Sequence, residues 1–462
     1  MKLPLPISTY KLDATQASAR RLVNCYIEQV DAKSPVVLKR SPGIKPWGTV
    51  GTKGRGLHAD TRTGKLYAAS GNSLYRVSTD GIGTALGTII GDGMVSMDNN
   101  IDSVVCVTNP QAYYYNGTFG QITDPDFTSR GASQVKFLGN WMLFLEPDSG
   151  RQFGANFGTV TNFDALNFAT AEGSPDNTNQ ILSDKQQLVQ LGSVSTEIAY
   201  NSGRSGYPFE RLPSGGDFNL GTPATMSGAL IDNTFGFLAS DFTVRLLRGV
   251  TPVRVSTHAI EEAIRSLERK DDAIGLAFTL TGHLFYALNF PSGERTFVYD
   301  VTTQQFHEVG SYIDQNWQVV SVAAAYGKIL VQDGATGRIG ELDPGYYAHW
   351  DEPQVMSWTY QSVYAENETA FHDRLEIIGT KGVGLISGQG FDPQIMLEVS
   401  DDGGKTFRMF SSRSLGKMGE YKWRVFWDQL GSSKDRVYRC SVSDPVEVAI
   451  MDTQLYTRGG RV

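Results

Sequence analysis

The chain has 462 residues and a formal net charge of −8, and 19% of its residues are charged and 11% are aromatic. This composition excludes a disordered chain, because it supplies enough apolar side chains to bury a large core. It also lacks the basic surplus of a protein that grips nucleic acid through phosphate contacts, so any DNA that meets the chain is expected to slide past an acidic wall.

Short apolar strands separated by glycine-containing turns fill residues 41–347. In the clearest unit, residues 64–77, two alternating strands flank a Ser-Gly-Asn turn, which is a hairpin signal. Related units begin at Gly139, Gly282 and Gly327. Repetition at ~45–50 residues is typical of β-propeller blades, because one small sheet cannot bury both faces and several must pack around an axis. The spacing predicts about six blades, with five or seven left open.

A long loop within the repeats, residues 201–216, carries Tyr207, Phe209 and Arg211 among glycine, serine and proline. Long loops on a rigid scaffold often carry contacts. We therefore treat these three side chains as a candidate surface for another subunit or a partner protein.

One helix is predicted inside the repeats, over residues 258–267. Ile260, Ile264 and Leu267 follow the i, i+4, i+7 spacing and form an apolar stripe opposite charged residues. We expect this helix to connect two blades and to pack on its own propeller. A contact with a neighbouring subunit is the alternative.

The sequence changes character near residue 352, where a new series of alternating strands begins. Alternation indicates that one face of each strand is buried and the other is wet. We predict an all-β chain of three parts: an N-terminal arm (1–40), a β-propeller (41–351) and a C-terminal antiparallel, β-sandwich-like domain (352–462).

An Asp-box pattern, Ser-x-Asp-x-Gly-x-Thr-Phe, occurs in the C-terminal part. Its positions are filled by Ser400, Asp402, Gly404, Thr406 and Phe407. Asp-boxes occur in sialidases and other sugar-handling propellers, which makes a carbohydrate-active enzyme an alternative. The chemistry favours a structural turn, because the aspartate can accept backbone N–H groups and the glycine allows a positive φ. The box also lies outside the blade repeats.

The sequence selects no catalytic, metal or cofactor site. The six histidines lack the HxH or HxxxH spacing of a metal site. Glycoside hydrolysis needs two carboxylates across a cleft, and nothing in the sequence singles out such a pair. No nucleophile elbow precedes a helix. We predict that the chain is not an enzyme and needs no cofactor.

Cysteine content and the N-terminal sequence bear on the compartment. Cys25, Cys106 and Cys440 are odd in number and far apart, which suits a reducing compartment rather than a disulfide framework. The first residues hold no apolar run typical of a secretory signal, and no stretch approaches the ~18 apolar residues of a membrane helix. We expect a soluble chain made in the cytosol.

Two blocks of sequence stand out for their order along the chain. The first comprises Arg-Leu-Val-Asn-Cys-Tyr-Ile-Glu at 21–28, the segment 38–44 and the run 54–67; the second comprises the helix start at 256–261 and the strand at 298–300. Together they resemble the tail hub (nozzle) proteins of short-tailed phages, also called packaged-DNA stabilisation proteins.

The resemblance implies a ring, expected to be hexameric, below the portal and its adaptor in the virion. Such a ring would extend the DNA channel, retain packaged DNA without binding it specifically, and dock tailspikes or fibres. It implies assembly in the host cytoplasm and no membrane insertion. A sialidase-like enzyme and a receptor-binding fibre domain remain the alternatives.

Overall fold

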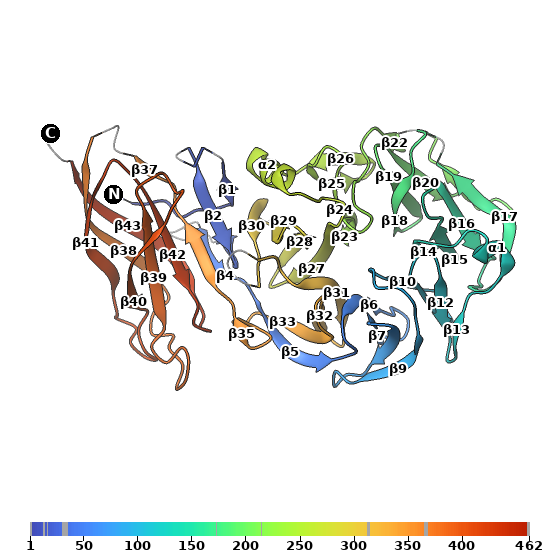
Figure 1. Cartoon of the computed structure of the whole chain (residues 1–462), viewed down its shortest axis with the longest axis horizontal. Coiled ribbons are helices and arrows are strands. Elements are labelled where there is room, and N and C mark those ends of the chain that lie inside the picture. The colour runs from blue at the N-terminus through green and yellow to red at the C-terminus, as the bar shows by residue number, and fades with distance from the viewer. Residues whose placement is uncertain are drawn as a thin grey trace.

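Almost all regular structure in the chain is β-strand, arranged as a ring of small sheets with a two-layer sandwich beside it (Figure 1). The structure is a computed structural model. It describes residues 2–12, 14–15, 17–29, 36–171, 173–213, 215–311, 315–364 and 368–459.

The first four blades of the propeller follow one another in the chain as antiparallel meanders. Blade 1 comprises β6 (Gly54–Ala59), β7 (Leu66–Ser70), β8 (Ser73–Val77) and β9 (Gly83–Thr88). Blade 2 comprises β10 (Ser96–Asn99), β11 (Val104–Val107), β12 (Ala112–Tyr115) and β13 (Phe119–Gln121), and the short helix α1 (Pro125–Thr128) follows it. Blade 3 comprises β14 (Gln134–Leu138), β15 (Trp141–Leu145), β16 (Arg151–Ala155) and β17 (Phe163–Thr170). Blade 4 comprises β18 (Thr178–Asp184), β19 (Gln187–Gly192), β20 (Thr196–Asn201), β21 (Phe209–Arg211) and β22 (Asp217–Phe218).

The remaining blades include the predicted helix and a strand from the N-terminal part of the chain. Blade 5 comprises β23 (Ala229–Ile231), β24 (Thr234–Leu238), β25 (Val244–Arg248) and β26 (Thr251–Arg254), and α2 (His258–Ser266) leads from it to blade 6. Blade 6 comprises β27 (Ile274–Leu280), β28 (His283–Phe290), β29 (Arg295–Asp300) and β30 (Gln305–Glu308). Blade 7 comprises β31 (Val319–Ala325), β32 (Lys328–Asp333), β33 (Arg338–Asp343) and β5 (Gly43–Thr49), with β34 (Ala348–His349) and β35 (Glu352–Pro353) beyond β5.

Strand β5 closes the propeller, because it precedes blade 1 in sequence yet pairs antiparallel with β33 of blade 7. The described residues thus form seven blades, one more than the spacing favoured and within the range of five to seven. The repeat spacing underestimated the number because the early blades are short. Their innermost strands begin at Gly54, Ser96 and Gln134, closer together than the ~45–50 residues assumed.

Buried glutamines cross-link neighbouring blades. Gln332 of blade 7 donates its Nε2 to the Ala69 carbonyl (3.1 Å) and accepts the Gly56 N–H (3.0 Å), both in blade 1. Gln180 of blade 4 makes the same pair of bonds with Gly228, at 3.2 and 2.8 Å, just before blade 5. Each amide satisfies its donor and its acceptor on a neighbouring backbone, so the sheets are joined by hydrogen bonds as well as by packing.

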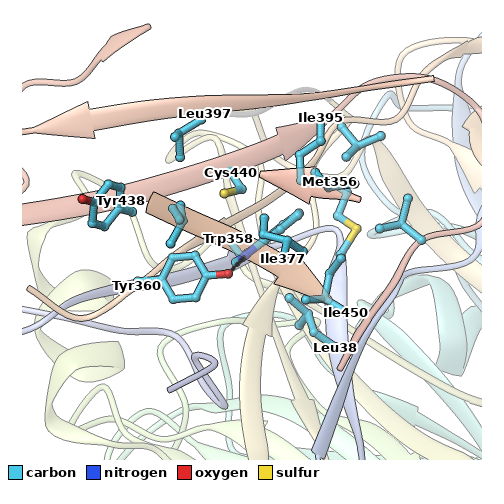
Figure 2. Close-up of a cluster of buried hydrophobic side chains, with 14 of the residues drawn as sticks. Leu38, Met356, Trp358, Tyr360, Ile377, Ile395, Leu397, Tyr438, Cys440 and Ile450 are labelled. Carbon is cyan, nitrogen blue, oxygen red and sulfur yellow. Dashed lines mark hydrogen bonds between the residues drawn. The ribbon is translucent and has the colours of Figure 1, made fainter. Parts of the chain in front are cut away.

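The sandwich comprises two sheets with a shared apolar core. One sheet contains β2 (Ala19–Val23), β36 (Met356–Thr359), β42 (Asp435–Val442), β39 (Gln394–Ser400) and β40 (Arg408–Ser414), with β1 (Tyr10–Lys11) and β37 (Val363–Tyr364) at its margins. The other contains β3 (Cys25–Gln29), β4 (Val36–Arg40), β43 (Ala449–Gly459), β38 (Ala370–Gly379) and β41 (Val425–Ser433). Figure 2 shows Trp358 and Tyr438 of the first sheet in the same cluster as Leu38 and Ile377 of the second.

The described part of residues 1–40 is built into these sheets rather than standing apart as an arm. Strand β2 pairs with β36, and β4 pairs with β43. Burial explains this, because Leu22, Cys25, Ile27 and Leu38 are all buried in the sandwich core. The N-terminal segment is therefore a structural part of the C-terminal domain.

Candidate functional site

The propeller and the sandwich share one continuous sheet at their junction. Strand β30 of blade 6 pairs in parallel with β2 through Glu308 and Val23, and β2 continues antiparallel to β36. Within this sheet, β2 lies between β30 of the ring of blades and the strands β36 and β42 of the sandwich (Figure 1). Relative motion of the two domains would break these backbone hydrogen bonds, so the junction favours a fixed arrangement.

Glu308 anchors a buried ion-pair network at this junction. Its side chain is only 4% exposed, and its carboxylate accepts from Arg21 Nε (3.0 Å) and Nη2 (3.0 Å) and from Arg295 Nε (3.1 Å). Burial by itself raises the pKa of Glu308, but the two guanidinium groups outweigh it and hold the pKa below its usual value. Arg21 belongs to the sandwich and Arg295 to the propeller, so one carboxylate joins both domains.

Asn24 turns the chain from β2 into β3 at the same junction. It is fully buried with a φ of +53°, a left-handed conformation that asparagine tolerates better than most residues. Its Nδ2 donates to the carbonyls of Gly310 (3.0 Å) and Val355 (2.9 Å), and its Oδ1 accepts the Gly310 N–H (3.0 Å). The side chain thereby connects the end of blade 6 to the strand that opens the sandwich.

Arg40 fastens the other side of the junction. Its Nε donates to Gln354 Oε1 (3.1 Å) and its Nη1 to the Val446 carbonyl (3.1 Å), and further bonds reach the carbonyls of Gln354 and Asp444. The side chain is buried, so these acceptors replace the water it has lost. Gln354 is oriented in turn, with its Nε2 3.2 Å from His349 Nε2.

A buried histidine–aspartate pair lies nearby, between blade 6 and β3. His283 Nδ1 is 2.7 Å from Asp300 Oδ2, and His283 Nε2 faces Glu28 at 3.4 Å. The hydrogen bond to Asp300 is the main reason that the pKa of His283 is raised. Tyr26 packs edge-on against the imidazole, with ring centroids 5.0 Å apart. The second imidazole nitrogen faces a carboxylate rather than a nucleophile. His283 therefore has a structural role and links Asp300 of blade 6 to Glu28 of β3.

These residues explain the first block of the sequence resemblance. Arg21, Asn24, Tyr26, Glu28 and Arg40 all make contacts that join the propeller to the sandwich. Sequence reasoning identified the block and missed its role. The signal was a cluster of polar residues in otherwise apolar strands, which indicates buried polar contacts.

The second block anchors helix α2 on blade 5. Glu261 is buried and accepts from Arg254 Nε (2.6 Å), Arg254 Nη2 (2.6 Å) and Ser256 Oγ (2.7 Å). Ile260 and Ile264 point into the core between blades 5 and 6. The helix therefore connects two blades and packs on its own propeller.

The Asp-box forms the turn between β39 and β40. Asp402 accepts the backbone N–H groups of Lys405 (2.9 Å) and Thr406 (3.0 Å) and the Ser400 hydroxyl (2.6 Å), which lowers its pKa. Gly404 adopts a φ of +91° and donates its N–H to Ser400 Oγ (2.9 Å). Phe407 completes the box, with the guanidinium of Arg439 4.0 Å above its ring. The box lies in the sandwich, away from the propeller axis.

The loop with Tyr207, Phe209 and Arg211 does not present its aromatic rings to a partner. Tyr207 and Phe209 are buried and pack edge-on against Trp141 of blade 3, with ring centroids 5.6 and 6.4 Å apart. Arg211 is partly exposed and pairs with Asp217 at 2.7 Å. The predicted aromatic contact surface is therefore corrected: large rings at this loop fill the gap between blades 3 and 4.

The described residues show little that would indicate catalysis. Two acids of the propeller, Glu146 and Asp241, are each paired with an arginine of their own blade, Arg151 and Arg245. No group of three or more histidine, cysteine, aspartate or glutamate side chains in the described ranges could hold a metal ion. None of the described helices has the length and apolar run needed to span a membrane.

A cavity of about 520 Å³ lies among the loops that lead between blades of the propeller. Its lining includes Asp92, Asp272, Asn109, Met94 and Met226, contributed by loops of several blades. A hollow between blades is expected of this architecture, because propeller blades are arranged around a central channel. Its lining combines acidic and apolar side chains without a convergent catalytic set.

Two models of known protein families match the chain, one over each domain. A model described as bacteriophage P22 Gp10, beta-propeller, matches residues 7–347, and one described as bacteriophage P22 Gp10, beta-sandwich, matches residues 357–458. These matches confirm the predicted succession of propeller and sandwich. No curated protein sequence matches the chain.

Among solved structures, the computationally designed Ika8 protein is 14% identical over 70% of this chain and 99% of its own, with a TM-score of 0.41. BamB from Moraxella catarrhalis is 11% identical over 74% of this chain and 97% of its own, also with a TM-score of 0.41. The two family models together span most of the sequence, and they agree with the resemblance of its two blocks. The chain therefore belongs to the bacteriophage P22 Gp10 family, the packaged-DNA stabilisation or tail hub family.

Proposed function

We propose that this phage structural protein forms the tail hub ring below the portal–adaptor complex, extends the DNA channel and retains the packaged genome. The observation that carries the proposal is the family match over both domains, residues 7–347 and 357–458. The ring is a homohexamer, and its outer surface docks tailspikes or fibres. It acts in the virion after assembly in the host cytoplasm.

Two physical features support this role. The junction around Glu308 holds propeller and sandwich as one body, which suits a subunit that must keep a channel wall in place. The net charge of −8 suits a wall that DNA passes without being held, because like charges repel at short range.

Assembly tests the ring directly. The full chain is mixed with the portal and adaptor proteins of its phage, and the products are weighed by mass photometry and imaged by negative-stain microscopy. We expect a closed ring of six copies on the adaptor side of the complex, with an open centre. A chain that stays monomeric beside an intact portal–adaptor complex would overturn the proposal.

DNA retention needs a separate measurement. Filled heads assembled without this protein are compared with heads to which it has been added, and the DNA that becomes sensitive to nuclease is measured over time. We expect the added protein to slow DNA loss. Equal loss in both samples would remove the retention role and leave the structural role open to the assembly test.

A further inference from the structure

Two loops pack on each other at one end of the sandwich and form a defined surface, here called the loop pair. They are residues 380–393, between β38 and β39, and residues 415–424, between β40 and β41. Gly382 donates its N–H to the Leu415 carbonyl (3.1 Å), and Gly419 donates to the Gly382 carbonyl (3.3 Å). Mutual hydrogen bonds give the loop pair a fixed shape.

The loop pair exposes large apolar side chains to solvent. Ile386 is 80% exposed and Tyr421 is 74% exposed. The others that are at least one-third exposed are Leu385, Phe391, Met418 and Trp423. Such a concentration of exposed apolar surface, unlike scattered single residues, marks an interaction site.

The loop pair is also basic. These loops carry four basic residues, Lys381, Lys417, Lys422 and Arg424, and two acidic ones, Asp392 and Glu420. Arg424 pairs with Glu376 outside the loops, which leaves three lysines. Both acids are engaged locally, because Asp392 accepts the Ser414 hydroxyl and Glu420 accepts the Lys417 backbone N–H (2.8 Å). The loop pair therefore combines apolar surface with a positive charge, in a protein whose net charge is negative.

A complementary surface lies on the outer edge of blade 3. Strand β17 is the last strand of its sheet, so one backbone edge is left without a neighbouring strand of this chain. Leu166 on β17 is 78% exposed, and Phe157 in the preceding loop is 62% exposed beside a hollow of about 510 Å³. Asp126 and Asp164 add negative charge at this edge, and neither forms an ion pair within the described part of the chain.

The two surfaces lie toward opposite ends of the long axis of the molecule, with the sandwich at one end and β17 at the other (Figure 1). One copy therefore cannot join its own two surfaces. The charge distribution agrees with contact between copies: residues 43–351 contain 31 acidic and 21 basic residues, whereas the rest of the chain contains 18 and 20. A closed ring needs two different faces on each subunit.

We infer that the loop pair of one copy docks on the blade 3 edge of a second copy. Tyr421 and Ile386 cover the apolar side chains of Leu166 and its neighbours, and the lysines face Asp126 and Asp164. This contact specifies the subunit interface of the ring and rests on the proposed function. Apolar packing supplies the affinity, and the opposite charges select the partner face and the register.

Cross-linking in the assembled ring locates the contact. Tyr421 is replaced by the photoreactive residue benzoylphenylalanine, and copies labelled with ¹⁴N and ¹⁵N are mixed and assembled on the portal–adaptor complex. We expect cross-links between differently labelled copies that map to residues 157–168. A ring whose cross-links map to another segment, to the adaptor or only within one copy would overturn this inference and leave the proposed function intact.

A charge exchange tests the same contact by rescue. Lys422→Glu and Asp164→Lys should each lower the fraction of chain assembled into rings at least tenfold, because each places like charges together. The double variant should regain most of the assembly. Lys434→Glu is the matched control, because Lys434 is an exposed sandwich lysine outside the loop pair. Equal effects of all three single variants, or no rescue, would contradict the contact, whereas failure of the unaltered chain to assemble would overturn the proposed function itself.

Discussion

Arg21 on β2 and Glu308 on β30 form a two-point ion pair that joins the sandwich to the propeller, with Nε–Oε1 and Nη2–Oε2 distances of 3.0 Å each. Their strands also pair directly, because Val23 lies opposite Glu308 in the shared sheet. The side-chain contact and the backbone contact therefore reinforce each other at the same place.

Removal of the Glu308 charge should loosen this junction. Glu308→Gln leaves two arginines facing a neutral amide in a buried site, so we expect the free energy of unfolding to fall by about 3 kcal/mol. Urea denaturation followed by tryptophan fluorescence measures the change. Glu294→Gln, an exposed acid on the same blade, is the control and should change little. A loss no larger than that of the control would show that the pair does not support the junction.

Closure of the propeller should depend on Gln332. Gln332→Leu leaves the N–H of Gly56 and the carbonyl of Ala69 without their side-chain partner, at an expected cost of about 2 kcal/mol. Hydrogen exchange should show faster exchange of the Gly56 amide while blade 4 keeps its protection. Gln121→Leu, at an exposed glutamine of blade 2, serves as the comparison. Unchanged protection at Gly56 would exclude the proposed bond.

The Asp-box turn should be sensitive to a side chain at Gly404. A Cβ at Gly404 would lie 3.0 Å from the Cβ of Ala19, and the φ of +91° adds backbone strain, so Gly404→Ala should cost about 2 kcal/mol. Gly282→Ala separates the two causes, because Gly282 has a φ of +85° with nothing near its Cβ. Thermal unfolding of both variants gives the comparison. If both variants lose the same stability, backbone strain at positive φ accounts for the whole effect and the contact with Ala19 adds nothing.

His349 should make the junction less stable in mild acid. Burial, aided by the charge of Arg40, lowers its pKa to about 3. The unfolded chain takes up a proton near the ordinary pKa of about 6.5 whereas the folded chain does not, so stability is full above that pH and falls as the pH drops toward 3. His307 and His372, with pKa values of about 4, act in the same direction, whereas the raised pKa of His283 acts in the opposite one.

The slope of stability against pH isolates the His349 contribution. His349→Gln should reduce that slope between pH 5 and pH 6 by up to about 1.4 kcal/mol per pH unit, the effect of one proton. Urea denaturation at several pH values measures it, and the result does not depend on the absolute stability of the variant. An unchanged slope would mean that His349 takes its proton in the folded state.

The repeat pattern and the second series of strands predicted the two β domains, because strand alternation and turn residues are local properties of the sequence. The packing of Tyr207 and Phe209 against Trp141 and the partnership of Arg21 with Glu308 depend on residues far apart in the chain. A single sequence does not specify such pairs. The sequence alone therefore predicts a surface position for the aromatic loop, and it shows the junction only as a run of residues similar to a family.

Strand β5 and the strands before it set a condition on synthesis of the chain. Residues 43–49 complete blade 7 only when residues 338–343 have been made, and β4 meets its partner β43 only when the last strand is complete. A growing chain on the ribosome must therefore hold β5 without its antiparallel partner, and one edge of β4 uncovered, while most of the protein is still being translated. Early strands with exposed edges are prone to aggregate, so slow translation or a missing C-terminal segment should lower the yield of soluble protein more than it would for a chain whose domains fold one after another.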